Sequence, residues 1–193
     1  GSGGNDTIDY SGSASGVTVS LVGGVAGVGG DAQGDKLWEF ETVIGSSFND
    51  VLTGQTTGNV LNGGAGDDLL EGGRGNDTLD GGTGNDTYVF APGWGQDVIL
   101  NLDVHADGLD TDRIVFVGGI RAEDVEVSSS GHDLVLRHKG TADRVTVSGF
   151  FVDAMELAPG AFGRHAQNVG LQTDVGREFP FALGAAVDAG LDA

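Results

Sequence analysis

Three aspartates recur at intervals of nine residues, each at the sixth place of a glycine-rich unit. The units are Gly63–Glu71, Gly72–Asp80 and Gly81–Val89, and they read GGAGDDLLE, GGRGNDTLD and GGTGNDTYV. Glycines at the first, second and fourth places permit backbone angles that other residues avoid, and they leave main-chain carbonyl oxygens unshielded. A carboxylate beside such carbonyls offers hard oxygen ligands, of which Ca²⁺ takes about six to eight at roughly 2.3–2.6 Å. The pattern therefore predicts calcium binding at Asp68, Asp77 and Asp86.

The same units predict the fold that must position these carboxylates. The eighth place is apolar in each unit (Leu70, Leu79 and Tyr88), so each unit directs one side chain inward. Nine residues are too few for a full coil, and two units should form one coil of a flattened parallel β-roll. Units n and n+2 then stack on the same side with an ion between their turns. One unit alone cannot complete a site.

Weaker copies of the unit lie on both sides of the perfect ones. Upstream, Gly54–Asn62 has Asn at the sixth place, and Gly45–Thr53 has Phe at the fourth place. Downstream, after two extra residues, Pro92–Leu100 keeps the glycines of the second and fourth places and the sixth-place Asp. The first residues, Gly1–Asp9, also match. The sequence thus predicts at least six contiguous units and an isolated one at the start.

Stacking of units n and n+2 places the strongest expected sites between Asp68 and Asp86 and between Asp77 and Asp97, with Asp50 and Asn59 as secondary candidates. Asp103, Asp107, Asp110 and Asp112 form an acidic segment that is either solvated or an extra calcium site, and Asp112 is its best ligand because a strand follows directly. The predicted ligands for several Ca²⁺ ions are repeat glycines and sixth-place residues together with Asp112: Gly64, Gly66, Asp68, Gly73, Gly75, Asp77, Gly82, Gly84, Asp86, Gly93, Gly95, Asp97, Asp50, Asn59, Asp112 and Asp6.

The composition links calcium binding to folding. The chain has 29 acidic and 9 basic residues, a net charge of −20 and 37 glycines among 193 residues. Such charge opposes a compact state and favours disorder, so calcium that neutralises the aspartates should also fold the chain. The charge disfavours nucleic acid as a partner. There is no cysteine for a disulfide or thiolate site, and no apolar run approaches the roughly 20 residues of a membrane span.

The segment between the first unit and the continuous array, Tyr10–Ile44, is expected to continue the roll in irregular form. Val17–Val22 alternates like a strand. Asp35–Thr42 is predicted to form one or two helical turns capped by Asp35. Trp38 and Phe40 are expected to be core or lid residues rather than a ligand platform.

After the repeats the pattern changes to longer alternating strands, predicted at Arg113–Val117, Asp124–Ser128, Asp133–Arg137 and Arg144–Ser148. The fold class is therefore all-β, a parallel β-roll followed by a short antiparallel capping region. We divide the chain into an irregular N-terminal roll segment (1–44), the repeat roll (45–100), the cap (101–152) and a tail (153–193). The tail is expected to be weakly ordered; a secretion signal, a linker and a strand with a helix are the alternatives.

The repeats resemble the calcium-binding repeats of RTX proteins. The stretch DTYVFAPGWGQDVI…DTDRIVFVGGI…EDVEVSSSGHDLVLRHKGTADRVTVSGFF resembles the region that closes RTX blocks in haemolysins, adenylate cyclase toxins and RTX adhesins. The segment NDTIDYSGSASGVTVSL is similar to the one that precedes such arrays. The resemblance covers about residues 1–152 and implies that the cap closes the roll and promotes its folding. A roll also ends in a sheet edge that must be covered. The resemblance further implies type I secretion, with unfolded export and folding in external calcium, outside the cell or on a bacterial surface.

Two functions follow as hypotheses. The first is a non-catalytic, monomeric calcium-responsive folding module of a larger exoprotein, of which this chain would be an excised piece. The alternative is a carbohydrate- or surface-binding module of an adhesin or polysaccharide-active enzyme, which would use Trp38 or Trp94. Catalysis is not expected, because the histidines follow no HExxH or triad order: His105, His132, His138 and His165.

Overall fold

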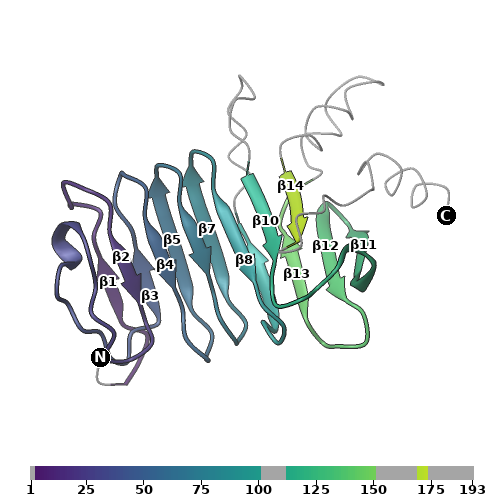
Figure 1. Cartoon of the computed structure of the whole chain (residues 1–193), viewed down its shortest axis with the longest axis horizontal. Coiled ribbons are helices and arrows are strands. Elements are labelled where there is room, and N and C mark those ends of the chain that lie inside the picture. Colours follow the sequence, from purple (N-terminus) through teal and green to yellow (C-terminus); the bar gives the residue numbers. More distant parts are fainter. Residues whose placement is uncertain (1–2, 101–111, 151–168, 174–193) are drawn as a thin grey trace.

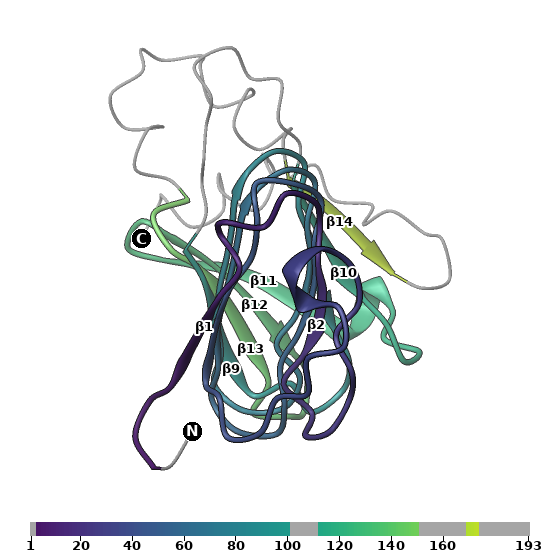
Figure 2. The same ribbon diagram turned by 90° about the vertical axis from the view of Figure 1, so that its left-hand side faces the viewer.

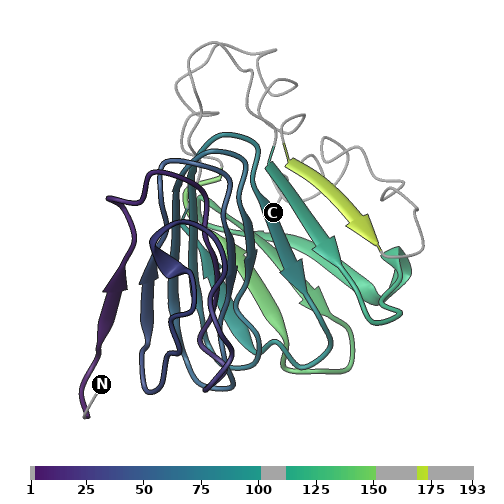
Figure 3. The same cartoon turned by 60° about the vertical axis from the view of Figure 1, so that its left-hand side comes forward.

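The computed structural model describes residues 3–100, 112–150 and 169–173, and in these ranges the fold is all-β. Two sheets of mostly parallel strands lie face to face and form a roll, and antiparallel strands extend one of them at the C-terminal end (Figure 1). Figure 3 shows the coils stacked one behind another, with the antiparallel strands at the end far from the N-terminus. The predicted fold class is confirmed.

Each coil contributes one strand to each sheet, and strands consecutive along the repeats alternate between the two. The first sheet has the order β1 (Thr7–Asp9), β3 (Thr42–Ile44), β5 (Val60–Ala65), β7 (Thr78–Thr83), β9 (Gln96–Ile99), β13 (Arg144–Val147), β12 (Asp133–His138) and β11 (Val125–Ser130). The second has the order β14 (Val169–Thr173), β10 (Asp112–Phe116), β8 (Thr87–Phe90), β6 (Leu69–Glu71), β4 (Val51–Thr53) and β2 (Thr18–Ser20).

The register between neighbouring coils follows the nine-residue unit taken twice. In the first sheet Leu61 pairs with Leu79, and in the second Leu52 pairs with Leu70. The next step in the first sheet, from Leu79 to Ile99, is longer by the two extra residues that precede Pro92. The eighth-place side chains are buried between the sheets as predicted, and they form the core with their neighbours.

The N-terminal segment covers the outer edge of β2. Thr18 and Val28 exchange two main-chain hydrogen bonds of 2.7 and 2.9 Å, so a loop takes the place of a further strand. Figure 2, which views this end, shows the loop with its 3-10 turn η1 (Gly30–Ala32) in front of β2. Ala32 and Leu37 from this loop are buried in the core. The loop therefore protects a sheet edge that would otherwise be open.

One prediction for this segment is wrong, and the prediction that Trp38 and Phe40 are core or lid residues holds for Phe40 but not for Trp38 as a core residue. No helix forms over residues 35–42, because Glu39 has a φ of 59°, which lies outside the right-handed helical region. Trp38 is not a core residue: it is 55 % exposed and lies over Gly23 and Gly24, whereas Phe40 packs partly buried against the core.

The four strands predicted after the repeats are all present, with ends within two residues of the predicted ones. They belong to two different parts of the structure. β10 pairs in parallel with β8 and continues the second sheet of the roll. The other three, β11, β12 and β13, form an antiparallel meander, and β13 joins it in parallel to β9. We call β11–β13 the cap. The division of the chain at residues 44, 100 and 152, made from the sequence, stays a prediction.

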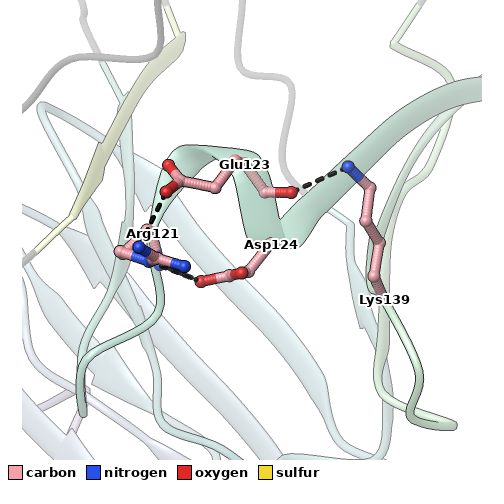
Figure 4. A network of polar contacts seen from close by, with 4 residues as sticks. All are labelled: Arg121, Glu123, Asp124 and Lys139. Atoms are coloured by element: carbon pink, nitrogen blue, oxygen red, sulfur yellow. Dashed lines mark hydrogen bonds and ion pairs between the residues drawn. The ribbon is translucent and has the colours of Figure 1, made fainter.

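An exposed ion network braces the cap at the 3-10 turn η2 (Ala122–Asp124) (Figure 4). Arg121 forms ion pairs of 2.9 Å with Glu123 and 3.3 Å with Asp124. Lys139 donates a 2.7 Å hydrogen bond to the Glu123 carbonyl oxygen, which ties η2 to the turn after β12. Exposed pairs of this kind contribute little stability singly, so their role is to fix the turn.

No helix in the described ranges is long and apolar enough to cross a membrane.

Candidate calcium sites

The glycines of each turn are required for two different reasons. Second- and fourth-place glycines such as Gly64 (φ 105°) and Gly66 (φ 115°) lie in the left-handed region, as the sequence predicted. First-place glycines do not. A Cβ on Gly63 would collide with Oδ2 of Asp68 and would lie 2.6 Å from the Gly81 carbonyl oxygen. The first glycine therefore leaves room beside the carboxylate.

Sixth-place carboxylates connect one coil to the next through hydrogen bonds that we call the inner ladder. On the side that leads into the second sheet, Asp68 Oδ1 accepts from the Asp50 N–H (2.7 Å) and Asp86 Oδ1 accepts from the Asp68 N–H (2.9 Å). Asp112 extends this side, because its Oδ1 accepts from the Asp86 N–H at 3.0 Å. The structure thus brings Asp68 and Asp86 together and places Asp112 in line with them.

The other side of the inner ladder leads into the first sheet. Asp77 Oδ1 accepts from the Asn59 N–H (2.8 Å), and Asp97 Oδ1 accepts from the Asp77 N–H (2.9 Å). The predicted pairing of Asp77 with Asp97 is therefore present in the geometry.

One oxygen of several ladder carboxylates is left for another partner. Oδ2 of Asp68, Asp77 and Asp97 is buried and has no hydrogen-bond donor in the described part of the chain. A buried carboxylate oxygen without a donor is costly. A cation can satisfy it, and the adjacent main-chain carbonyls add oxygens of the kind that calcium prefers. The residues present therefore fit calcium.

Main-chain oxygens must supply much of any coordination shell. The described ranges contain no cluster of three or more His, Cys, Asp or Glu side chains that could hold a metal by themselves. Zinc sites are built from such side-chain clusters, whereas calcium sites use carbonyl oxygens readily.

Burial raises the pKa of the ladder carboxyls above their ordinary value of 3.8. The pKa of Asp68 is raised to about 7, mainly by desolvation and further by the charges of Asp86, Asp50 and Asp67. Desolvation raises the pKa of Asp77 to about 6. The pKa of Asp97 is raised to about 7 by desolvation and by the nearby charges of Asp77 and Asp143. The metal-free turns thus disfavour the charged form that calcium requires.

The secondary candidates have a different environment. Asp50 Oδ1 accepts from the Val17 N–H (2.7 Å) and the Ser46 hydroxyl (2.8 Å), and its Oδ2 accepts from the Ser46 N–H. Asn59 Oδ1 accepts from the Gln55 N–H at 2.8 Å. Protein donors already satisfy these oxygens, so a metal role for Asp50 and Asn59 stays a prediction with less support. Asp6 lies at the N-terminal end, where its N–H donates to Glu41.

The structure also shows an outer ladder that the sequence analysis missed. Fifth-place side chains accept hydrogen bonds from the fifth-place N–H of the next coil: Asn49 Oδ1 from Asp67 (3.0 Å), Asp67 Oδ1 from Asn85 (2.9 Å) and Asn76 Oδ1 from Gln96 (3.0 Å). These bonds run in the opposite direction to those of the inner ladder. The sequence does contain a pattern that indicates this ladder, since Asn or Asp occupies the fifth place in most units.

Outside the repeats, Asp143 of the cap was also missed; its carboxylate accepts hydrogen bonds from the Gly93 and Gly95 N–H groups. His132 is exposed in a turn, and His138 stacks on Trp94 with ring centroids 5.6 Å apart. The remaining candidates lie outside the described residues: Asp103, His105, Asp107, Asp110 and His165.

Comparison with known proteins identifies the repeats. The family model of the RTX calcium-binding nonapeptide repeat matches residues 53–88 in four copies. The chain contains RTX calcium-binding nonapeptide repeats. RTX repeats bind Ca²⁺ and are typical of secreted bacterial exoproteins, and the matched segment includes Asp68, Asp77 and Asp86 of the inner ladder.

A solved structure is also similar to this chain: the solution structure of the AlgE6R3 subunit from the Azotobacter vinelandii mannuronan C5-epimerase. The two are 28 % identical, with 65 % of this chain and 80 % of that chain covered and a TM-score of 0.33. No curated protein matches the chain.

Proposed function

We propose that this chain is a calcium-responsive folding module of a larger secreted protein, without catalysis of its own. The observation that carries the proposal is the inner ladder, in which buried carboxylate oxygens of Asp68, Asp77 and Asp97 have no donor in the described residues. An uncompensated buried carboxylate destabilises the metal-free roll. A bound calcium ion would supply the missing positive charge, and binding would then also be folding.

The proposed ligands are the sixth-place carboxylates and the carbonyl oxygens of the glycine-rich turns. Each carboxylate has two tasks in this scheme: Oδ1 holds the N–H of the preceding coil, and Oδ2 faces the metal. Register and metal binding are thereby coupled in one side chain, as the Asp77–Asp97 pair illustrates. The proposed sites comprise the ladder pairs first, then Asp112, and finally Asp50, Asn59 and Asp6.

The distribution of charge supports a division of labour between roll and cap. Residues 3–100 together with β10 (112–116) contain 15 acidic and 3 basic side chains, whereas residues 117–150, which include the cap, contain 5 acidic and 4 basic ones. Self-repulsion therefore opposes folding of the roll much more than folding of the cap. The cap is also built from antiparallel neighbours close in sequence, which close with little loop entropy. We propose that the cap forms first and that the coils add to β9.

In this proposal calcium is the trigger of folding, and the chain stays unfolded where calcium is scarce. Extracellular calcium modules bind at roughly 10⁻⁴–10⁻³ M. We propose export of the parent protein by a type I machinery and folding outside the cell or on its surface, with the module monomeric.

The test is a calcium titration of the chain followed by far-UV circular dichroism. In chelator the spectrum should be that of a disordered chain, and millimolar calcium should induce β-structure in a cooperative transition. Magnesium at the same concentrations should induce much less, because it requires near-ideal octahedral geometry. A chain that is already β-rich in chelator, or that folds equally with magnesium, contradicts the proposal.

A second candidate function is glycan binding. Trp38 is 55 % exposed against Gly23, and Gly23 lines an open groove of about 600 Å³ with Gln55, Glu71 and Arg74. Trp38 does not itself line the groove; it is linked to it through Gly23, and an exposed aromatic ring near a polar groove could receive a sugar. Trp94 is only 1 % exposed, so it cannot contact a glycan and is excluded from this hypothesis. Glycan-array binding in calcium that disappears in Trp38→Ala, while the circular dichroism is unchanged, would support it; an array without signal would exclude it.

A further inference from the structure

At the junction between the last repeat and the cap, no further coil follows. The last turn therefore has no next-coil carbonyl oxygen to accept its fourth-place N–H. In the interior, the fourth-place N–H of Gly66 donates to the carbonyl oxygen of Thr83 in the next coil at 2.9 Å. The equivalent N–H in the last repeat belongs to Gly95, and no repeat follows it. The next strand in the first sheet is β13 of the cap, in which Arg144 pairs with Gln96. Asp143 therefore lies opposite Gly95.

The Asp143 side chain accepts two hydrogen bonds from the last turn, and the one from Gly95 is the bond that a further coil would accept. Its Oδ2 accepts from the Gly93 N–H at 2.8 Å, and its Oδ1 accepts from the Gly95 N–H at 3.3 Å. A carboxylate has two acceptor oxygens, so one side chain can satisfy two N–H groups of the same turn. Asp143 is only 8 % exposed, which keeps water from competing for these donors.

The turn that carries Asp143 is itself held in place. The Asp143 N–H donates to Thr141 Oγ1 at 3.1 Å, and the Thr141 hydroxyl donates to the His138 carbonyl oxygen at 2.9 Å. The His138 ring stacks on Trp94 with an interplanar angle of 15°, and its Nδ1 lies 3.8 Å from Asp143 Oδ2. Backbone and ring contacts from the cap thus converge on one turn, Gly93–Asp97.

We propose that Asp143 is a positioning residue that ends the RTX array: its carboxylate takes the place of the next coil's carbonyl oxygen at Gly95, also holds Gly93, and so fixes the Gly93–Asp97 turn. The site of Asp77 and Asp97 then reaches its final geometry only when the cap is docked. This inference rests on the proposed calcium-dependent folding. It extends that function by naming the side chain through which the cap and the last calcium site are coupled.

The experiment compares calcium titrations of the full chain with Asp143→Ala and Asp143→Asn. Asp133→Ala is the matched control, because Asp133 also accepts from a glycine N–H (Gly149, 2.8 Å) but lies within the cap. All variants carry Trp38→Phe, which leaves Trp94 as the single tryptophan and as a fluorescent reporter of the junction.

Fluorescence and circular dichroism should change together in the parent chain. In Asp143→Ala the calcium midpoint of the Trp94 fluorescence should rise by about tenfold, because charge-assisted hydrogen bonds are lost. The midpoints measured by fluorescence and by circular dichroism should then differ from each other. The calcium midpoint of Asp143→Asn should lie between those of the parent chain and Asp143→Ala, because the amide keeps only one acceptor oxygen. This variant also provides the comparison if Asp143→Ala does not fold.

Amide hydrogen exchange gives a second readout that general destabilisation would not reproduce. Gly93 and Gly95 should lose protection selectively in the Asp143 variants and keep it in Asp133→Ala. Equal midpoints and equal exchange at these glycines in the Asp143 and Asp133 variants overturn the inference. If the parent chain is folded without calcium, the proposed function fails, but exchange at Gly93 and Gly95 still decides the role of Asp143.

Discussion

At the scale of single residues, the sixth-place aspartate combines two tasks that substitution can separate. Asp77→Asn retains a carbonyl oxygen for the Asn59 N–H but removes the charge that would face a metal. We therefore expect the roll to keep its register while the calcium midpoint rises by roughly tenfold, equivalent to about 1.4 kcal/mol. A calcium titration by circular dichroism measures this. Asp80→Asn, at the ninth place of the same unit, should leave the midpoint unchanged; equal shifts in both variants would contradict the role of Asp77.

The raised carboxyl pKa values predict how the metal-free roll responds to pH. The pKa of Asp68 and Asp97 is about 7 in the folded chain, against 3.8 as the ordinary value. The folded form therefore keeps its protons between these values while the unfolded form loses them, so stability is fully present below pH 3.8 and is lost as pH rises through 7. In chelator, the chain should gain β-structure between pH 8 and pH 5. The same experiment on Asp68→Asn with Asp97→Asn should show a smaller gain; no gain in the parent chain would contradict the assignment.

At the scale of elements, the nine-residue period was sufficient to predict the strand register and the paired aspartates. It could not predict features that depend on contacts between segments distant in the sequence. The period was sufficient for the pairing of Leu61 with Leu79 and of Asp77 with Asp97, because stacked units repeat the same local geometry. The exposure of Trp38 was not predictable, since it depends on a positive φ at Glu39 and on two glycines distant in sequence. Asp143 belongs to no unit, and only the register of β13 on β9 reveals it.

The outer ladder predicts a stabilising role for a fifth-place side chain that has no metal to hold. Asn76→Ala removes the acceptor of the Gln96 N–H, and a hydrogen bond of this kind contributes about 1 kcal/mol. We expect the calcium-loaded roll to lose that much stability in urea without loss of a bound ion. Isothermal titration counts the ions, and Thr83→Ala, at an exposed third place, is the control. A reduced ion count in Asn76→Ala would show that the outer ladder also shapes the metal sites.

At the scale of the whole molecule, Trp94 joins roll and cap: the ring of His138 in β12 stacks on it with centroids 5.6 Å apart, and Phe90 and Phe116 of the roll lie 5.8 and 5.4 Å from it. The unequal charge of the two parts then suggests an order of events. Each calcium site at about ten times its Kd contributes roughly 1.4 kcal/mol. A few sites therefore approach the net stability of a small domain, on the order of 5 kcal/mol. Calcium would thus stabilise the roll, while the nearly neutral cap provides a surface on which the first coil can pair.

This order of events is testable by kinetics. Leu136 in the cap and Leu61 in the roll are both fully buried, and truncation of either to Ala should cost about 2–5 kcal/mol. If the cap forms first, its contacts are already present in the folding transition state. Leu136→Ala should then slow folding after calcium is added, and Leu61→Ala should mainly accelerate unfolding after chelation. Stopped-flow fluorescence of Trp94, with all chains carrying Trp38→Phe, measures both rates. The opposite assignment, with Leu61→Ala slowing folding and Leu136→Ala leaving it unchanged, would place the nucleus in the roll, and the cap would then act only as a cover for its last edge.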